Sequence, residues 1–342
     1  MKRLVIIGGG FAGSTIAREL EGKFSVVLID SKDYFEFTPG VLRTIVEPEH
    51  IKRIQRLHRD YLKKTKIVLG SVSDINRKYV FVNNEKILFD YLVIASGSRY
   101  NVPFKESKAV VATRSVTLKN CYDELCRAKN VLIVGGGLVG VELAGEICTH
   151  YKDKKIVIVH AKDKLIDRNH EKAIKHAENF LRKKGVKIIF NERIIKFDKN
   201  FISNKGKKYR TGISFLCTGI VPNSSFLMKN FSDSLTHKGF IKVNEYLQLE
   251  GEKGIFAVGD VNDRMEEKTA QNAERQAKIA VKNICALEHE KSLEKYHSKK
   301  TPLVISLGRW NGIYSQGSFV FTGLIPGLMK RIIEWKEMIK LR

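Results

Sequence analysis

The chain has 342 residues, enough for two or three globular domains, and its 43% hydrophobic and 29% charged residues exclude an intrinsically disordered protein. The 61 Lys and Arg residues against 37 Asp and Glu leave a formal net charge of +24. This charge favours anionic partners such as cofactor phosphates or lipid headgroups, although a generally lysine-rich composition is an equal alternative. Nucleic acid is not expected as a partner, because no recognition motif is present and the aromatic residues do not interleave with a basic run.

The first predicted elements form a dinucleotide-binding pattern. An apolar strand over residues 4–7 runs into Gly8-x-Gly10-x-x-Gly13, and a helix is predicted over residues 14–20. In such a pattern the first glycine makes the tight turn, the second admits a pyrophosphate, and the third lets the helix pack on the strand. The N–H groups at the helix start then bind the phosphates.

The second predicted strand, residues 25–29, ends in Asp30. An acidic residue about 20 positions after the glycines is placed to accept a hydrogen bond from a ribose hydroxyl. A turn residue at a strand end is the alternative. This first unit closes with a buried strand and small-residue turn over residues 91–97.

The pattern then repeats. A strand over residues 131–134 precedes Gly135-x-Gly137-x-x-Gly140, and residues 141–150 form a predicted helix. One such motif also suits plain strand–helix packing, but two in matching context predict two dinucleotides on one chain.

The repeated unit differs at the end of its second strand. Residues 156–159 lead to His160, where a site specific for NAD usually has a carboxylate. Without that charge, and with Lys162 nearby, the site would tolerate a 2′-phosphate. We therefore expect NADH or NADPH as the second dinucleotide.

A further strand and turn follow much later in the chain. Residues 254–258 precede Gly259-Asp260, and a helix is predicted from residue 269 to about residue 287. The carboxylate of Asp260 is suited to a sugar or ribityl hydroxyl, and the helix start to a pyrophosphate or pyrimidine edge. This position is the one expected if the repeated unit is inserted within the first.

The last segment, residues 317–342, belongs to neither unit. Leu328, Ile332, Trp335 and Ile339 follow helical spacing, and basic residues surround them. A basic amphipathic helix of this kind suits the surface of an anionic membrane. Packing on the body of the protein, or on the partner in a homodimer, is the alternative.

The expected location is the cytoplasm, with peripheral association at the inner face of the cell membrane. No run approaches the roughly 20 apolar residues that span a bilayer. The first residues lack the order of a signal peptide, and the five scattered cysteines fit a reducing compartment.

Together these motifs resemble the flavoproteins with two dinucleotide-binding domains. The likeness extends over nearly the whole chain, and it is greatest to type II NADH dehydrogenases and to the apoptosis-inducing-factor-like, ferroptosis-suppressor-like branch. The segments that carry it are residues 95–97, 137–146, 160–161, 216–220, 223–225, 259–260, 269–276 and 307–309, with both glycine motifs.

The resemblance implies an α/β fold with two Rossmann-like domains, the NAD(P)H domain inserted in the FAD domain, plus a C-terminal membrane-associating segment. The FAD domain would comprise residues 1–113 and 241–300, and the NAD(P)H domain residues 114–240. Residues 301–342 would form the C-terminal segment with its basic amphipathic helix.

It also implies an FAD-dependent NAD(P)H:quinone oxidoreductase that works without a redox-cysteine relay. Residues 34–42, where related disulfide reductases carry a cysteine pair, contain none, and Cys121 and Cys126 lie in a predicted helical linker. A sulfide:quinone or other pyridine-nucleotide-linked flavoprotein oxidoreductase is the alternative. A nucleic-acid-binding or signalling flavoprotein is the rival from another class.

The resemblance assigns two catalytic candidates. Glu142 would orient the nicotinamide or manage protons, with a surface glutamate on a helix as the alternative, and Gln271 would lie near the quinone. No metal site is expected. The candidate cofactor-binding residues are Gly8, Gly10, Phe11, Ala12, Gly13, Asp30, Ser31, Lys32, Thr38, Pro39, Arg43, Ala95, Ser96, Gly97, Gly135, Gly137, Gly140, His160, Thr218, Gly219, Gly259, Asp260 and Ala270.

Overall fold

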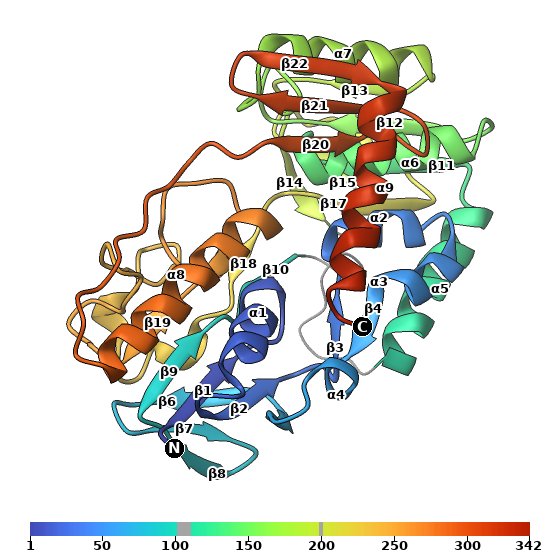
Figure 1. The fold of residues 1–342 in the computed structure, drawn as a ribbon. Helices are drawn as coiled ribbons and strands as arrows, with labels where there is room; N and C mark the ends of the chain where they lie inside the picture. Colours follow the sequence, from blue (N-terminus) through green and yellow to red (C-terminus); the bar gives the residue numbers. More distant parts are fainter. Residues whose placement is uncertain (101–110, 198–200) are drawn as a thin grey trace.

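The computed structural model describes residues 1–100, 111–197 and 201–342 (Figure 1). Two parallel sheets organise it, one in the lower and one in the upper part of Figure 1. Apolar runs explain why these strands form, because strands covered on both faces read as continuous hydrophobic segments.

The first sheet has the strand order β19-β9-β1-β2-β5, and all its pairs are parallel. Helices α1 (Phe11–Leu20) and α8 (Ala270–Glu288) pack against each other beside it. The strand β19 comes from late in the chain and pairs with β9. The strands are β1 (Arg3–Ile7), β2 (Ser25–Asp30), β5 (Lys66–Leu69), β9 (Tyr91–Ile94) and β19 (Ile255–Ala257).

Shorter elements decorate this sheet. Between β2 and β5 lie a two-stranded ribbon, three short α-helices and two 3-10 turns: β3 (Tyr34–Glu36), β4 (Gln55–Leu57), α2 (Val41–Thr44), α3 (Ile51–Ile54), α4 (His58–Tyr61), η1 (Thr38–Gly40) and η2 (Pro48–His50). Between β5 and β9 lies an antiparallel sheet of β6 (Val72–Ile75), β7 (Tyr79–Val82) and β8 (Glu85–Leu88).

The second parallel sheet has the order β13-β12-β11-β17. Its strands are β11 (Asn130–Val134), β12 (Lys155–Val159), β13 (Lys187–Ile189) and β17 (Ile213–Leu216). The accompanying helices are α5 (Val111–Arg127), α6 (Leu138–His150) and α7 (Glu171–Lys183). A small antiparallel sheet contains β14 (Ile194–Phe197), β15 (Phe201–Ser203) and β16 (Lys208–Tyr209).

Two chain crossings connect the sheets. They pair as an antiparallel ribbon of β10 (Ser98–Arg99) and β18 (Val221–Pro222). Hydrogen bonds between Ser96 and Asn223 fasten the crossings at 2.6 Å (hydroxyl to carbonyl) and 3.0 Å (amide to carbonyl). Both crossings therefore lie side by side where the chain passes between the two sheets.

The C-terminal segment is more ordered than the sequence predicts. Its apolar stretch forms an antiparallel sheet of β20 (Leu303–Ser306), β21 (Gly312–Gln316) and β22 (Phe319–Gly323), which contacts α6 and α7. Helix α9 (Leu324–Ile339) then runs from this sheet to α3 in the other half (Figure 1). Helix α9 begins at Leu324, four residues before Leu328, which is the first residue of the predicted apolar face. Within the described ranges, no helix combines the length and apolar character needed to cross a bilayer.

Candidate active site

The first glycine loop has the geometry that the sequence predicts. Gly8 has a φ of +98°, and a Cβ there would lie 2.4 Å from the carbonyl oxygen of Ala95. A Cβ on Gly13 would lie 1.8 Å from the Gly8 carbonyl oxygen, so only glycine lets α1 approach β1 this closely. Beside Gly10, in contrast, nothing lies within 4 Å of a built Cβ. The loop is therefore open where a pyrophosphate would approach the helix start.

The second glycine loop repeats this geometry. A Cβ on Gly135 would lie 2.3 Å from the carbonyl oxygen of Cys217, and one on Gly140 would lie 2.0 Å from the Gly135 carbonyl oxygen. Gly137 again faces open space at the start of α6. Both loops thus present an open cradle of backbone N–H groups, which is the arrangement that a dinucleotide pyrophosphate requires.

Asp30 is buried at the end of β2, where it holds the first loop. Its carboxylate accepts hydrogen bonds from the backbone N–H of Gly9 at 2.8 Å and of Lys32 at 3.1 Å, and it lies 3.2 Å from Nε2 of His58. Burial raises the pKa of Asp30, but the His58 hydrogen bond and the charge of Lys32 outweigh it, so that the net pKa is lowered. The carboxylate is therefore ionised at neutral pH. Its His58 partner has no sequence signature.

His160 occupies the equivalent position in the second unit. Its Nδ1 accepts a hydrogen bond from the backbone N–H of Gly136 at 3.0 Å, as Asp30 does from Gly9. Burial lowers the pKa of His160, so the ring is neutral and its proton is on Nε2. That buried Nε2 has no hydrogen-bond partner among the described residues. His160 thus holds the second glycine loop through Gly136, as Asp30 holds the first through Gly9.

Glu142 lies in the first part of α6 and is 9% exposed. It accepts hydrogen bonds from Lys330 Nζ at 2.9 Å and from the backbone N–H of Ser306 at 2.8 Å. It is therefore not a surface glutamate, because residues of α9 and β20 cover it. The sequence places Lys330 only among the basic residues around the C-terminal helix, and its ion pair with Glu142 follows from the fold.

Glu146, one turn further along α6, anchors the first unit to the second. Its Oε1 accepts from Arg43 at 3.0 Å and from the Ser306 hydroxyl at 3.2 Å. Arg43 is a candidate cofactor-binding residue, and in the structure its guanidinium is engaged by this carboxylate. The contact brings α2 against α6.

A small cavity, about 20 Å³, joins these groups. It is lined by Pro39 and Arg43 from the first unit, Glu142 from the second, and Lys330 from α9. Three segments that are far apart in sequence therefore meet at one place. The neighbouring Thr38 donates a hydrogen bond to the carbonyl oxygen of Glu36 at 3.3 Å, which ties this loop to β3.

Glu36 and Arg114 form a fully buried ion pair under the same loop. Two guanidinium nitrogens of Arg114 lie 3.0 and 3.1 Å from the two carboxylate oxygens, and Gln55 donates a further bond at 2.9 Å. Burial raises the pKa of Glu36, but the charge of Arg114 outweighs this and keeps the net pKa low. The pair links α5 to β3, and no local pattern in the sequence indicates it.

A family model identifies the protein family of the chain. The family model described as pyridine nucleotide-disulphide oxidoreductase matches residues 2–277. This chain belongs to that family. Members of the family are flavoproteins, and the chain is a pyridine nucleotide-linked oxidoreductase with FAD and NADH or NADPH as its cofactors. The resemblance to two-domain flavoproteins is thereby confirmed.

Curated relatives resemble the chain over most of its length. Apoptosis-inducing factor homolog B of Dictyostelium discoideum is 34% identical, over 91% of this chain and 89% of its own. Ferroptosis suppressor protein 1 of Homo sapiens is 30% identical, over 98% of this chain and 95% of its own. These relatives agree with the branch that the sequence motifs indicate.

Solved structures share the fold at lower sequence identity. The sulfide:quinone oxidoreductase of Aquifex aeolicus has a TM-score of 0.85 and 17% identity, over 100% of this chain and 92% of that one. NDH2 from Plasmodium falciparum in complex with NADH has a TM-score of 0.81 and 16% identity, over 97% and 94%. The α/β architecture is thus that of the two-domain pyridine nucleotide-disulphide oxidoreductases.

The returning segment of this oxidoreductase meets the first unit at Asp260. The Ser98 hydroxyl donates to its carboxylate at 2.8 Å, and the Gly259 N–H donates to the side chain of Gln276 at 2.7 Å. Gln276 is buried and also accepts from Asn262 at 2.7 Å. Gln276 lies in the second turn of α8, and through these bonds it holds the Gly259 turn in place. The sequence does not reveal this role.

Two other predicted parts of the site, Gln271 and residues 218–219, lie away from these groups. Gln271, the candidate nearest the quinone, is exposed in the first turn of α8 beside Ala270, and it does not line the cavity at Glu142. Thr218 and Gly219 are exposed after β17. The structure leaves these side chains accessible, and their roles stay predictions.

The five cysteines are all free thiols in the described part of the chain. Cys121 and Cys126 share helix α5. Burial raises the pKa of Cys121 and of Cys148 to about 12, and it also raises that of Cys217. Since the thiolate is the reactive form, such buried thiols are poor nucleophiles at neutral pH.

Proposed function

We propose that this protein is an FAD-dependent NAD(P)H:quinone oxidoreductase without a protein thiol relay. The observation that carries the proposal is the meeting of Pro39, Glu142 and Lys330 around one small cavity. A polar, thiol-free junction of this kind suits direct passage of electrons between bound cofactors and a small acceptor. The name of the Aquifex aeolicus protein of similar fold adds support for a quinone acceptor at the level of the fold.

Each of the two glycine loops is assigned one cofactor. We assign FAD to residues 1–113 and 241–300, through the Gly8 loop and Asp260, and NAD(P)H to the inserted residues 114–240. The strands of the second sheet lie between β9 and β19 in the sequence, yet β19 pairs with β9 in the first sheet. This pairing supports the insertion. Residues 301–342 form the C-terminal segment, which supplies Lys330 to the site.

When bound, the nicotinamide supplies a hydride that the flavin accepts and delivers as electrons to the quinone. The chain's own residues bind and orient these groups. The glycine loops hold the pyrophosphates with backbone N–H groups, and Asp30 fixes the first loop through Gly9. His160 fixes the second loop through Gly136.

Glu142 and Lys330 hold protons and charge beside the reacting groups. Quinone reduction takes up protons, and Lys330 keeps one on Nζ, 2.9 Å from Glu142 Oε1. The Ser306 N–H donates to the same oxygen and fixes the carboxylate further. In this arrangement the pair both orients a ligand and provides a proton at a defined atom.

We also propose peripheral association of α9 with an anionic membrane at the cytoplasmic side. Quinones dissolve in lipid, so a docked enzyme meets its acceptor directly. The exposed apolar side chains of α9 include Ile332 and Trp335, which are 60% and 64% exposed.

An activity screen tests the main proposal. The purified protein should show a flavin spectrum and oxidise NADH or NADPH when a short-chain quinone is added. Sulfide offered in place of NAD(P)H tests the sulfide:quinone alternative. A protein that takes up no FAD on reconstitution, or one that reduces quinone only with sulfide, would contradict the proposal.

A further inference from the structure

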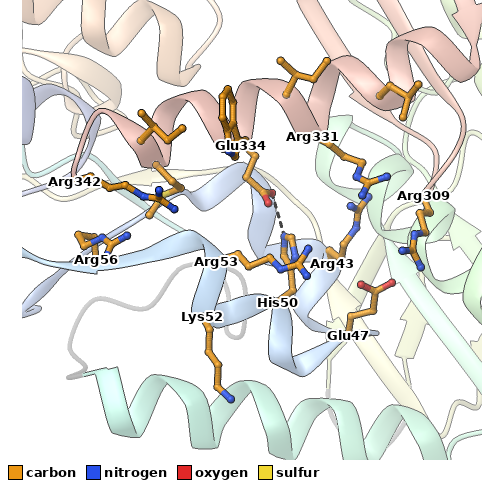
Figure 2. Close-up of a pocket in the computed structure, with 15 residues that line it drawn as sticks. Arg43, Glu47, His50, Lys52, Arg53, Arg56, Arg309, Arg331, Glu334 and Arg342 are labelled. Carbon is orange, nitrogen blue, oxygen red and sulfur yellow. Dashed lines mark hydrogen bonds and ion pairs between the residues drawn. The ribbon is translucent and has the colours of Figure 1, made fainter.

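A second and larger cavity lies between α9 and the segment that contains α2 and α3 (Figure 2). Its volume is about 670 Å³. Figure 2 shows Arg56 and Arg342 at one end and Arg309 and Arg331 toward the other. Six arginines line this arginine cavity: Arg43, Arg53, Arg56, Arg309, Arg331 and Arg342.

The positive charge of the arginine cavity is poorly compensated. Its two lining carboxylates are Glu47 and Glu334, and Glu334 lies 3.0 Å from Nε2 of His50. Five of the six arginines, all but Arg43, have no ion pair with a carboxylate in the part of the chain that the structure describes. Like charges that share a cavity repel one another, so an anion bound there is stabilised by all of them.

Several guanidinium groups are held in place and have donors to spare. Those of Arg309 and Arg331 lie 5.3 and 5.2 Å from the centre of the Trp310 ring, which orients both. The Nε atoms of Arg43 and Arg56 are buried and have no hydrogen-bond partner among the described residues. Buried donors without partners are costly unless a ligand satisfies them.

The same cavity has an apolar side. Leu328, Ile332, Trp335 and Ile339 of α9 line it together with the arginines. A free inorganic anion would use only the guanidinium groups, whereas a neutral quinone would leave them without a counter-charge. An amphiphile with an anionic head and an acyl chain uses both kinds of lining.

We propose that the arginine cavity binds the phosphate headgroup of an anionic phospholipid, with the acyl chains directed along the apolar side chains of α9. Guanidinium groups suit phosphate because they donate paired hydrogen bonds in a fixed plane. This proposal rests on the proposed membrane association of α9, and it adds which class of lipid binds and at which site. Arg43, Arg331 and Glu334 line both cavities, so the bound lipid lies next to the Glu142 site.

Binding of a soluble short-chain lipid tests this proposal without a membrane. Dihexanoylphosphatidylglycerol, kept below its micelle concentration, should bind the full-length protein with a stoichiometry of one in calorimetric titration. The triple variant Arg53→Gln/Arg56→Gln/Arg342→Gln should weaken this binding by about tenfold or more, because each lost guanidinium contact to phosphate is charge-assisted.

The matched control removes the same charge elsewhere. Arg18, Arg193 and Arg210 are exposed and do not line the cavity, so their triple change to Gln should leave the affinity within about twofold, the size of a long-range charge effect. Melting temperature and flavin content check that both variants fold. The single variant Arg342→Gln, at an exposed position, should give an intermediate loss.

Competing ligands separate the sources of phosphate. Dihexanoylphosphatidylcholine and inorganic phosphate should bind more weakly than the anionic lipid. Equal binding of inorganic phosphate would show a free-anion site and overturn the lipid assignment, as would equal loss in the two triple variants or no binding. None of these readouts depends on electron transfer, so their failure is distinguishable from failure of the oxidoreductase proposal.

Discussion

At the scale of single residues, the Lys330–Glu142 ion pair carries the most chemistry. Removing Lys330 leaves a carboxylate that is 9% exposed without its cation, and such a group is costly to keep charged. In the proposed function, the change also removes a proton donor from the site.

We therefore expect Lys330→Met to lower kcat with a soluble short-chain quinone by about tenfold to hundredfold, the usual contribution of a positioned proton donor. Flavin content should be unchanged, and the pH profile of kcat should shift. Lys336→Met is the matched control, because Lys336 is exposed on the same helix. Equal kcat values for the two variants would show that Lys330 has only a structural role.

At the scale of elements, the contact between α8 and α9 contains two carboxylates with one cation between them. Lys340 Nζ lies 3.5 Å from Glu274 of α8 and 2.6 Å from Glu337 of α9. Burial, followed by the hydrogen bond with Glu337, raises the pKa of Glu274 to about 7. The folded protein thus binds this proton more tightly than the unfolded chain does.

Because the folded pKa is the higher one, the stabilisation is present below the ordinary pKa of 4.5 and is lost as the pH rises through about 7. We expect Glu274→Gln to raise Tm by about 2 °C at pH 8, after allowance for solvent screening, and to flatten the fall of Tm between pH 5 and pH 8. Scanning calorimetry of this variant and of Glu19→Gln, an exposed position on α1, measures the difference. Parallel curves for wild type and Glu274→Gln would contradict the assignment.

How much the sequence could predict also differs between elements. The strand and glycine motif at residues 4–13 and their repeat at residues 131–140 depend on local patterns, and β1, α1, β11 and α6 confirm them. The sheet β20–β22 was not predicted, because its Gly and Pro residues read as interruptions of an apolar run. Its strands are fixed by contacts with α6 and α7.

Side-chain partners far apart in sequence were beyond prediction. Glu142 was selected by its place in the second glycine helix, but its partner Lys330 is 188 positions away. Arg114 and Glu36, 78 positions apart, were not selected at all. Such pairs are decided by how the elements pack, and no spacing rule within one element reports on them.

At the scale of the whole molecule, α9 has a buried side and an exposed apolar side. Pro326, Gly327 and Met338 are buried, whereas Ile332 and Trp335 border the arginine cavity and are largely exposed to solvent. Truncation of the helix would therefore damage the core as well as any membrane contact, and point variants are the sharper test.

We expect Ile332→Ser/Trp335→Ser to lose about tenfold or more in affinity for vesicles that contain anionic lipid, because both side chains would no longer enter the apolar boundary. Activity with a soluble quinone should persist. Vesicle flotation measures the loss, and Leu88→Ser/Ile195→Ser, at positions 58% and 54% exposed, is the control. Equal flotation of the two variants would favour packing against a partner subunit.

Helix α9 also has a mechanical consequence. It is fastened to α6 through Lys330 and Glu142, to residue His50 of the first unit through Glu334, and to α8 through Lys340. Met338 and Leu341 are embedded in the core of the first unit, while β20 belongs to the core of the second. Helix α9 thus connects the two halves of the molecule and holds them at a fixed distance. A hinge motion between them would have to break these contacts together, so one C-terminal element sets the distance between the two glycine loops.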